Sequence, residues 1–345
     1  MKKHYICYVA GRSGGHIVPA LTLAEQYKKN NPDAHVIFIS TNTAVDKSLT
    51  DQEQIINRNI HISLNNVPGK KLHRYPHFFY QLCTSVLKSF YYLVRFRPTK
   101  IIAMGGYISI PVIFVAWILR IPTELFELNV VPGKATLFLK KIVSRILICF
   151  SEAKQYLPTD KCFSASYPIR FSETSKTISR QEALASMTFL SARKTIMILG
   201  GSQGSQFINN LIKKWISEHP EYHNQIQVIH QTGLLNDKFD LEDFYIERKI
   251  PAFVFDYCNE LEYCYRAADL IICRAGAGTL FEINFFEKPF ITIPLQTAST
   301  AHQGYNAQAM AQKIPTLCTI YNQNEIENNQ TVLFNSILSQ LQKQK

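Results

Sequence analysis

The residues that suggest chemistry most directly lie between positions 269 and 308. Arg274 to Gly278 is a turn of arginine, alanine and glycine, which lies between the apolar run Leu270 to Cys273 and a helix predicted to open near Thr279. A second apolar run, residues 290 to 294, predicts a strand after the helix. Glycines let a ligand approach the backbone, and free N–H groups at the start of a helix favour an anion. The chemistry expected here is the binding of a ligand that carries phosphate.

Polar side chains near this turn are candidates for contacts with the rest of such a ligand. Glu282 is expected in the first turn of the helix, where its carboxylate can accept two ribose hydroxyls. Thr279 and Glu282 also have the spacing of a capping box, which closes a helix without any ligand. His302, Gln303 and Asn306 begin another helix, where polar side chains are usually only solvated. The residues alone leave both interpretations open.

A second glycine-rich turn follows the first apolar run of the chain. His4 to Ala10 predicts a buried strand, which ends in the loop GRSGGH at residues 11 to 16, before apolar residues at helical spacing. The loop fits neither the dinucleotide motif nor the Walker motif, so neither NAD nor a P-loop is supported. His16 is a candidate general base for a sugar hydroxyl, because the unperturbed pKa of histidine lies near neutrality. A histidine that only donates to the helix backbone fits the residues as well.

Length and composition predict a folded protein of two domains with an anionic partner. The 345 residues exceed one ordinary core, and an apolar fraction of 46% with 18% charged residues leaves little room for disorder. Lysine and arginine outnumber aspartate and glutamate by 37 to 26, so the formal net charge is +11. That balance favours phosphate, acidic lipid or nucleic acid. The eight cysteines show no metal-ligand spacing and are typical of reduced thiols in a cytosolic protein.

The segment from residue 67 to residue 100 predicts a basic helix with more aromatic side chains than one buried face can hold. It contains no acidic residue, and its predicted buried face includes Phe79 and Phe90. Basic residues beside exposed aromatic rings suit the interface of an anionic membrane, although a nucleic-acid surface uses similar residues. The residues alone leave both partners open. Neither interpretation includes a membrane span, because the most apolar run, residues 108 to 119, is shorter than the roughly 20 residues that cross a bilayer. The apolar run at residues 5 to 10 is also too short for a signal peptide.

These motifs together resemble the MurG family, whose members are UDP-N-acetylglucosamine transferases that make the second lipid intermediate of peptidoglycan. Residues 274 to 282 and the run His302-Gln303-x-x-Asn306 are similar to the donor-nucleotide signature of the family. Residues 11 to 16 are similar to its G-G-T-G-G-H loop. GGYIS at residues 105 to 109 matches its second glycine loop, and GGSQG at residues 200 to 204 matches a third. The resemblance covers essentially the whole chain.

The chain departs from the family's motifs at three places. Arg12 replaces a glycine of the first loop, where a residue other than glycine adopts positive φ less freely. Phe126 and Leu128 replace the histidine and glutamine of an H-E-Q-N motif, and we expect the cleft to lose polar contacts there. Ser166 and Tyr167 replace the glycine and asparagine of a G-N-P-[VI]-R motif. The acceptor is therefore less closely specified than the donor.

The fold that the resemblance implies is the α/β class of GT-B glycosyltransferases, with two Rossmann-like parallel-sheet domains facing a cleft. Residues 1–165 are expected to form the acceptor and membrane-associated domain, joined by the C-terminal helix at about 324–345. Residues 166–323 are expected to form the UDP-sugar domain. Ligands of such sheets bind outside the carboxyl ends of the strands.

The resemblance also assigns roles to individual residues. His16 is the expected base, Glu282 is expected on the ribose and Gln303 on the donor sugar. The acceptor diphosphate is expected at Gly14, Gly15, Gly105, Gly106 and Tyr107. UDP-N-acetylglucosamine is expected to contact Ser13, Gly14, Gly15, Asn129, Arg170, Ser202, Cys258, Ala277, Gly278, Thr279, Leu280, Phe281, Glu282, His302 and Gln303.

The activity implied is an inverting transfer of N-acetylglucosamine from its UDP donor to undecaprenyl-diphospho-N-acetylmuramyl-pentapeptide. No D-x-D pair stands in a suitable loop, and we expect neither a metal nor another cofactor. Two alternatives stay open: a transferase of the same fold with another lipid acceptor, such as diacylglycerol, and a catalytically silent protein that binds UDP-sugar or glycolipid. The expected partners are the two substrates and an anionic membrane surface, not nucleic acid. The expected location is the cytoplasmic face of the inner membrane, as a peripheral protein.

Overall fold

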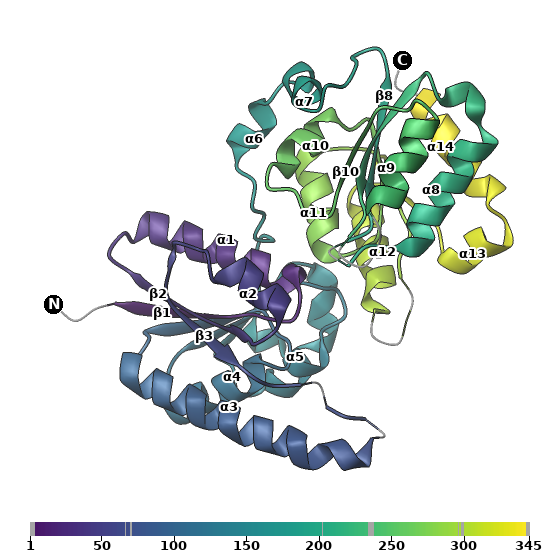
Figure 1. Cartoon of the computed structure of the whole chain (residues 1–345). Coiled ribbons are helices and arrows are strands. Elements are labelled where there is room, and N and C mark those ends of the chain that lie inside the picture. Colours follow the sequence, from purple (N-terminus) through teal and green to yellow (C-terminus); the bar gives the residue numbers. More distant parts are fainter. Residues whose placement is uncertain are drawn as a thin grey trace. The chain divides into compact units, whose positions relative to one another are not determined.

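The computed structural model describes residues 4–65, 67–69, 71–201, 203–233, 238–295, 297 and 300–342. The chain divides into two compact units, Met1–Arg170 and Phe171–Lys345. Each unit is a parallel β-sheet with helices on its faces (Figure 1). The predicted class, two Rossmann-like parallel-sheet domains, is confirmed.

The first unit contains a seven-stranded sheet in the order β3-β2-β1-β4-β5-β6-β7. The order reverses between β1 and β4, which makes the carboxyl ends of these two strands the expected ligand position. Its strands are β1 (Tyr5–Val9), β2 (His35–Thr41), β3 (Ile56–Ile62), β4 (Lys100–Ala103), β5 (Thr123–Glu127), β6 (Arg145–Ile148) and β7 (Cys162–Ser164). Its helices are α1 (Gly14–Asn30), α2 (Ala44–Thr50), α3 (Tyr75–Phe96), α4 (Ser109–Ile118) and α5 (Lys134–Leu139), with 3-10 turns η1 (Leu72–Arg74), η2 (Ser151–Tyr156) and η3 (Thr159–Lys161).

Two helical layers cover this sheet. Figure 1 shows α1 and α2 on one face and α3 and α4 on the other. The inner strands β1 and β2 are almost continuous apolar runs, as is typical of parallel strands buried on both faces. Val9 and Ile39 from the sheet share a buried cluster with Leu93 of α3 and Val112 of α4. In the described part of the chain, no helix combines the length and the apolarity that a membrane span requires.

Helix α3 buries only part of the face that its sequence predicts. Leu93 is buried and Val86 packs against the core, as expected. Phe79 and Phe90, expected on the same face, are 54% and 47% exposed, and the other buried residues are Ser85 and Ser89. Small side chains let the helix backbone approach the rest of the unit, and their hydroxyls bond to backbone: Ser89 Oγ donates to the carbonyl of Ser85 at 2.7 Å. The larger aromatic side chains therefore remain on the surface.

The second unit contains a six-stranded parallel sheet in the order β10-β9-β8-β11-β12-β13, which reverses between β8 and β11. Its strands are β8 (Lys194–Leu199), β9 (Ile226–Gln231), β10 (Ala252–Phe255), β11 (Leu270–Cys273), β12 (Phe290–Thr292) and β13 (Cys318–Ile320). Its helices are α6 (Glu173–Thr177), α7 (Arg180–Ser186), α8 (Gln206–Glu218), α9 (Lys238–Glu247), α10 (Leu261–Ala267), α11 (Ala277–Phe286), α12 (His302–Lys313), α13 (Gln323–Asn328) and α14 (Thr331–Gln342), with the 3-10 turn η4 (Pro220–Tyr222). Figure 1 shows α8 and α9 on one side of β8 and β10, and α10 and α11 on the other.

The last helix, α14, packs within the second unit. Leu333 and Ile337 are fully buried and share a cluster with residues of β8, β9 and α8. The sequence predicts that residues 324–345 join the first domain and that the boundary follows residue 165. The structure instead groups α14 with the second unit and divides the chain after Arg170. The apolar stripe of α14 explains the difference, because the sheet and α8 of its own unit bury that stripe.

Replacement of Leu333 by alanine tests this packing. Leu333→Ala is expected to lower the free energy of unfolding by about 2–5 kcal/mol, because it empties a buried leucine volume. Val332→Ala is the matched control on the same helix, since Val332 is 50% exposed. Urea unfolding of the full chain measures the loss, and amide hydrogen exchange locates it. Equal effects of the two variants, or lost protection only in β1 to β7, would contradict the packing.

Candidate active site

In the first unit, the two predicted glycine loops meet. They follow β1 and β4, which are neighbours in the sheet, so their parallel strands end at the same edge. A Cβ atom placed on Gly106 would lie 3.6 Å from Nδ1 of His16. The imidazole of His16 therefore lies within van der Waals reach of the second loop at Gly106.

The second loop depends on left-handed backbone. Gly105 and Gly106 have φ angles of +75° and +74°, which side-chain-bearing residues avoid. The hydroxyl of Ser109 donates to the carbonyl of Gly105 at 2.5 Å, and its N–H donates to the carbonyl of Gly106 at 3.1 Å. Tyr107 follows, half-buried, before α4 begins. The carbonyls of the loop are thus occupied by α4.

The first loop contains one left-handed residue, and it is Arg12 with φ +70°. This conformation costs an ordinary residue about 1–2 kcal/mol. The N–H of Arg12 donates to both carboxylate oxygens of Asp46, at 2.9 and 3.0 Å, and a hydrogen bond to a charged group contributes about 1.5–3 kcal/mol. These bonds offset the strain, so the loop keeps its shape without the family's glycine. Beyond it, Ser13 is extended and Gly14 and Gly15 open α1.

Asp46 was not among the predicted site residues. It lies in the polar stretch between the second strand and the basic helix, where neither periodicity nor a motif marks it. The one available signal was its position three residues after Thr43, which suits a helix start; the side chain of Thr43 does accept from the N–H of Asp46 at 3.2 Å. Its contact with the glycine loop depends on the fold.

The loop after β5 is organised around Glu127, which is 4% exposed. One carboxylate oxygen accepts from the backbone N–H and the side-chain amide of Asn129, at 3.0 and 3.3 Å. The other accepts from the N–H of Gly133 at 3.2 Å. Burial raises the pKa of Glu127, and hydrogen bonds from Thr136, Asn129 and Gly133 oppose that shift. Asn129 is therefore held in place by Glu127.

The two residues that depart from the H-E-Q-N motif are buried. Phe126 and Leu128 are 5% and 2% exposed, so both side chains lie in the core. The expected loss of polar contacts at the cleft stays a prediction. Apolar side chains fill buried sites there, which needs no compensating hydrogen bond. Glu127 and Asn129 keep the polar geometry of the loop.

In the second unit, α11 begins earlier than predicted. It starts at Ala277 with Gly276 as its N-cap, so Glu282 is the sixth helical residue and Thr279 cannot cap it. The capping-box interpretation of Glu282 is therefore wrong. Its Oε2 accepts a hydrogen bond from the hydroxyl of Tyr265 at 2.8 Å, which fixes the carboxylate against α10.

The start of α11 offers backbone donors to an anion. Its first helical bond runs from the N–H of Leu280 to the carbonyl of Gly276 at 3.1 Å. The N–H groups of residues 277 to 279 precede that bond, so they have no partner within the helix. Leu280 and Phe281 are 0% and 6% exposed, so only their backbone can face a ligand.

Three predicted residues follow other strands of the same sheet. His302 is the first residue of α12 and is half-buried, and burial lowers its pKa, which favours the neutral imidazole. Gln303 accepts from the N–H of Leu295 at 2.9 Å and so fixes the loop after β12. Cys258 lies in the loop after β10, the outer strand. The parallel sheet thus brings these residues to one edge with the start of α11.

Ser202 and Arg170 are two further predicted contacts of the UDP-sugar. Ser202 lies outside the described residues. Arg170 is the last residue of the first unit and is half-buried. Its expected contact with a donor phosphate stays a prediction.

Arg274 joins the loops of this edge through a buried guanidinium. It is 8% exposed, and it donates to Ser205 Oγ at 3.1 Å, to the carbonyl of Ile293 at 3.0 Å and to Gln323 Oε1 at 2.9 Å. Burial lowers the pKa of Arg274 to about 10, so it stays charged at neutral pH. All three acceptors are neutral and leave its positive charge in place. The sequence shows Arg274 as part of a motif but not this role.

Comparison with known proteins identifies the family. Residues 6–148 match the glycosyltransferase family 28 N-terminal domain, and residues 195–345 match the glycosyltransferase family 28 C-terminal domain. The chain is 30% identical over 312 residues to the UDP-N-acetylglucosamine--N-acetylmuramyl-(pentapeptide) pyrophosphoryl-undecaprenol N-acetylglucosamine transferase of Desulfotalea psychrophila, over 90% of this chain and 82% of that protein. It is 32% identical over 311 residues to the protein of that name from Halalkalibacterium halodurans, over 88% of this chain and 82% of the relative. The fold is similar to that of Acinetobacter baumannii MurG, with a TM-score of 0.69 and 21% identity over 98% of this chain and 92% of that one.

The chain belongs to the MurG family. This confirms the resemblance carried by the glycine loops and by the signature around residues 274 to 282. The likeness of the two units to MurG also confirms the GT-B fold class. The ligand contacts assigned to single residues stay predictions.

Replacement of Arg274 by lysine tests whether its guanidinium group joins the three loops. One ammonium cannot reach three divergent acceptors, and a hydrogen bond to a charged group contributes about 1.5–3 kcal/mol. Arg274→Lys is therefore expected to lower the free energy of unfolding by about 2 kcal/mol and to speed amide exchange at residues 203–205 and 293–295. Arg248→Lys is the control, because the side chain of Arg248 bonds to Phe244 and Glu247 of α9, within one helix. Unchanged exchange at both loops would contradict the role given to Arg274.

Proposed function

We propose that the protein transfers N-acetylglucosamine from UDP-N-acetylglucosamine to undecaprenyl-diphospho-N-acetylmuramyl-pentapeptide, the step from lipid I to lipid II in peptidoglycan synthesis. The observation that carries the proposal is the similarity to transferases of that name over about nine-tenths of the chain. The structure adds a glycine loop at the strand-order reversal of each sheet, where parallel sheets bind ligands.

The second unit is proposed to hold the donor. The diphosphate of UDP lies against the N–H groups of residues 277 to 279, which need no charge to bind an anion. The buried charge of Arg274 favours a negative ligand at the same edge. Glu282 accepts the ribose hydroxyls, and His302 and Gln303 contact the sugar. As UDP leaves, these fixed donors stabilise the negative charge that develops on its phosphate.

The first unit is proposed to hold the acceptor. Its diphosphate lies at the two glycine loops, which include Gly14, Gly15 and Gly106. His16 removes the proton from the attacking hydroxyl of the muramyl sugar as that oxygen forms a bond to the anomeric carbon. The bond from that carbon to the UDP oxygen breaks on the opposite side, so the configuration inverts. The half-buried imidazole beside Gly106 suits a base that is fixed in orientation but still accessible.

An anionic membrane is proposed to bind the exposed surface of α3 and α4, which pack against each other. This membrane patch consists of large apolar side chains that are at least 39% exposed: Phe79, Tyr80, Leu87, Phe90, Tyr91, Val94, Phe114, Trp117 and Ile118. An open groove of about 600 Å³ at the end of α4 is lined by Trp117, Ile118 and Arg120 among others. Exposed basic residues lie on and before the same helix, including Arg74, Lys88 and Arg95. Such a surface suits shallow insertion among acidic headgroups, here at the cytoplasmic face, where a UDP-sugar is available.

A transfer assay with two acceptors tests the proposed reaction. Labelled N-acetylglucosamine from its UDP donor is expected on the muramyl lipid and not on diacylglycerol. His16→Ala is expected to lose about 10²–10⁴-fold in kcat, the usual contribution of a general base, with little change in the donor KM. His4→Ala is the control, since His4 is exposed and contacts Tyr27. Product on diacylglycerol alone, or no product despite UDP-sugar binding, would contradict the proposal.

Charge reversal tests the membrane patch. The triple variant Arg74→Glu, Lys88→Glu and Arg95→Glu is expected to weaken binding to phosphatidylglycerol vesicles by more than about 100-fold, because each basic residue near an anionic surface contributes about 1 kcal/mol. Sedimentation with vesicles of increasing phosphatidylglycerol content measures the binding.

The control for this experiment makes the same change in net charge on the second unit. It replaces Lys214, Arg248 and Lys249 by glutamate. Lys214 lies on α8, and Arg248 and Lys249 directly follow α9. An equal loss in the control variant would show that total charge, and not the membrane patch, drives binding. Equal binding of the unmodified protein to neutral phosphatidylcholine vesicles would exclude the anionic preference.

A further inference from the structure

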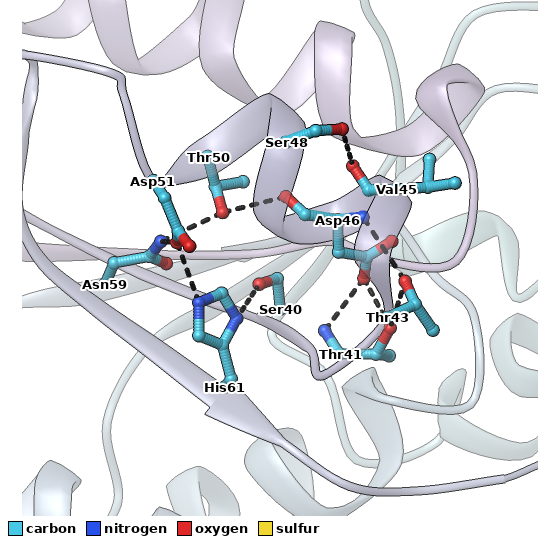
Figure 2. A network of polar contacts seen from close by, with 10 residues as sticks. All are labelled: Ser40, Thr41, Thr43, Val45, Asp46, Ser48, Thr50, Asp51, Asn59 and His61. Atoms are coloured by element: carbon cyan, nitrogen blue, oxygen red, sulfur yellow. Dashed lines mark hydrogen bonds and ion pairs between the residues drawn. The ribbon is translucent and has the colours of Figure 1, made fainter.

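The loop that leads to His16 is tied to a carboxylate inside the first unit. Asp46 lies in the first turn of α2 and is fully buried. Figure 2 shows its carboxylate directed at Thr41, whose backbone N–H and hydroxyl donate to Oδ2 at 2.9 and 2.5 Å. Thr43 caps the same turn (Figure 2). Asp46 is therefore fixed to β2 and to its own helix before it touches the loop.

The remaining donors to Asp46 come from the glycine loop itself. The N–H of Arg12 reaches both carboxylate oxygens, as described above. A Cβ atom on Gly11 would approach Oδ2 to 2.7 Å, closer than real Cβ contacts. The carboxylate thus packs directly on the backbone of residues 11 and 12. This contact fixes the point at which the chain leaves β1 and turns towards α1.

The neighbours of Asp46 suit a side chain with two acceptor oxygens. An aspartate accepts at both oxygens, whereas asparagine would place an NH₂ group against one of the N–H or O–H donors. Two N–H groups and one hydroxyl already point at Asp46. All three reach Oδ2, and the N–H of Arg12 also reaches Oδ1. An amide with its oxygen at Oδ2 places its NH₂ group 2.9 Å from the N–H of Arg12, donor against donor, and the opposite orientation takes the acceptor away from Thr41. The backbone of the loop is the part most able to move away from such a contact.

We propose that Asp46 is a positioning residue for the transfer reaction: it holds the first glycine loop, and through it His16, in the geometry that the reaction needs. This inference rests on the proposed function for its catalytic consequence. The structural part of the proposal is that the conformation of the loop depends on the Asp46 carboxylate, and this part rests on the contacts alone. The carboxylate touches no candidate ligand group and acts through the backbone of Gly11 and Arg12.

A second network on the same helix provides the matched control. Figure 2 shows His61 between Ser40 and Asp51, with Nδ1 2.9 Å from Ser40 Oγ and Nε2 2.9 Å from Asp51 Oδ1. These are the residue types of a nucleophilic triad, but Ser40 is fully buried, so a substrate cannot reach its hydroxyl. The network joins β2 and β3 to the C-terminal end of α2. Asp51 is 49% exposed and lies at the opposite end of α2 from the glycine loop.

Asp46→Asn and Asp51→Asn are compared in two measurements on the full chain. Amide exchange at residues 11 to 16 is expected to speed up at least about 10-fold in Asp46→Asn and to stay unchanged in Asp51→Asn. The kcat per folded molecule is expected to fall about 10- to 100-fold in Asp46→Asn, the loss typical of a displaced group, and less than about 2-fold in Asp51→Asn. Unchanged exchange and kcat in Asp46→Asn would overturn the proposal.

A double-mutant cycle separates positioning from a general loss of stability. If Asp46 acts through His16, then His16→Ala with Asp46→Asn loses no more activity than His16→Ala alone. Losses that multiply would overturn the positioning role.

If Asp46→Asn fails to fold, Gly11→Ala approaches the same contact from the loop. The added methyl would lie 2.7 Å from the carboxylate of Asp46 and about as close to Thr41, so it forces the loop away from both. Normal loop exchange and kcat in Gly11→Ala would overturn the proposal as well. An unmodified protein without transfer activity refutes the proposed function instead, and the exchange measurement still decides the contact.

Discussion

Each unit contains a buried charged side chain that bonds to neutral partners at a proposed ligand loop: Asp46 in the first unit and Arg274 in the second. Burying an ion is costly unless its hydrogen bonds are complete. Asp46 completes them with N–H and hydroxyl groups of the first glycine loop and β2. Arg274 completes them with a hydroxyl, a carbonyl and an amide from three loops of the second sheet. In both cases the charge holds backbone that lies where a diphosphate is proposed to bind.

The second constraint is the direction of the strands. Parallel strands present all their carboxyl ends at one edge, and the strand order reverses once in each sheet, between β1 and β4 and between β8 and β11. The glycine loops stand at those two places. Arg12 takes the place of a glycine in the first of these loops because its N–H bonds to Asp46. Phe126 and Leu128, which also depart from the family's motifs, lie in the core.

Much of this architecture was predictable from local pattern. Buried strands are continuous apolar runs, and glycine turns follow them directly, so the two sheets, the loops and the family could be predicted. The start of α11 was predicted too late, because Thr279 and Glu282 have the spacing of a capping box. The N-cap of the helix is in fact Gly276. Contacts that depend on tertiary structure were missed. Asp46 is one short polar side chain in a polar stretch, and nothing local shows that β2 and α2 carry it to the loop after β1. The buried face of α3 was predicted only in part. Leu93 lies in the core as expected, but two serines face inward beside it where large aromatic side chains were expected.

The proposal that the edge of the second sheet binds the nucleotide is open to one direct measurement. Amide hydrogen exchange of the full chain is followed with and without saturating UDP, which lacks the sugar. Slower exchange is expected at residues 275–279 and 203–205, with no change at residues 11–16 of the first unit. Protection confined to residues 11–16, or no protection at saturating UDP, would contradict the placement of the donor in the second unit.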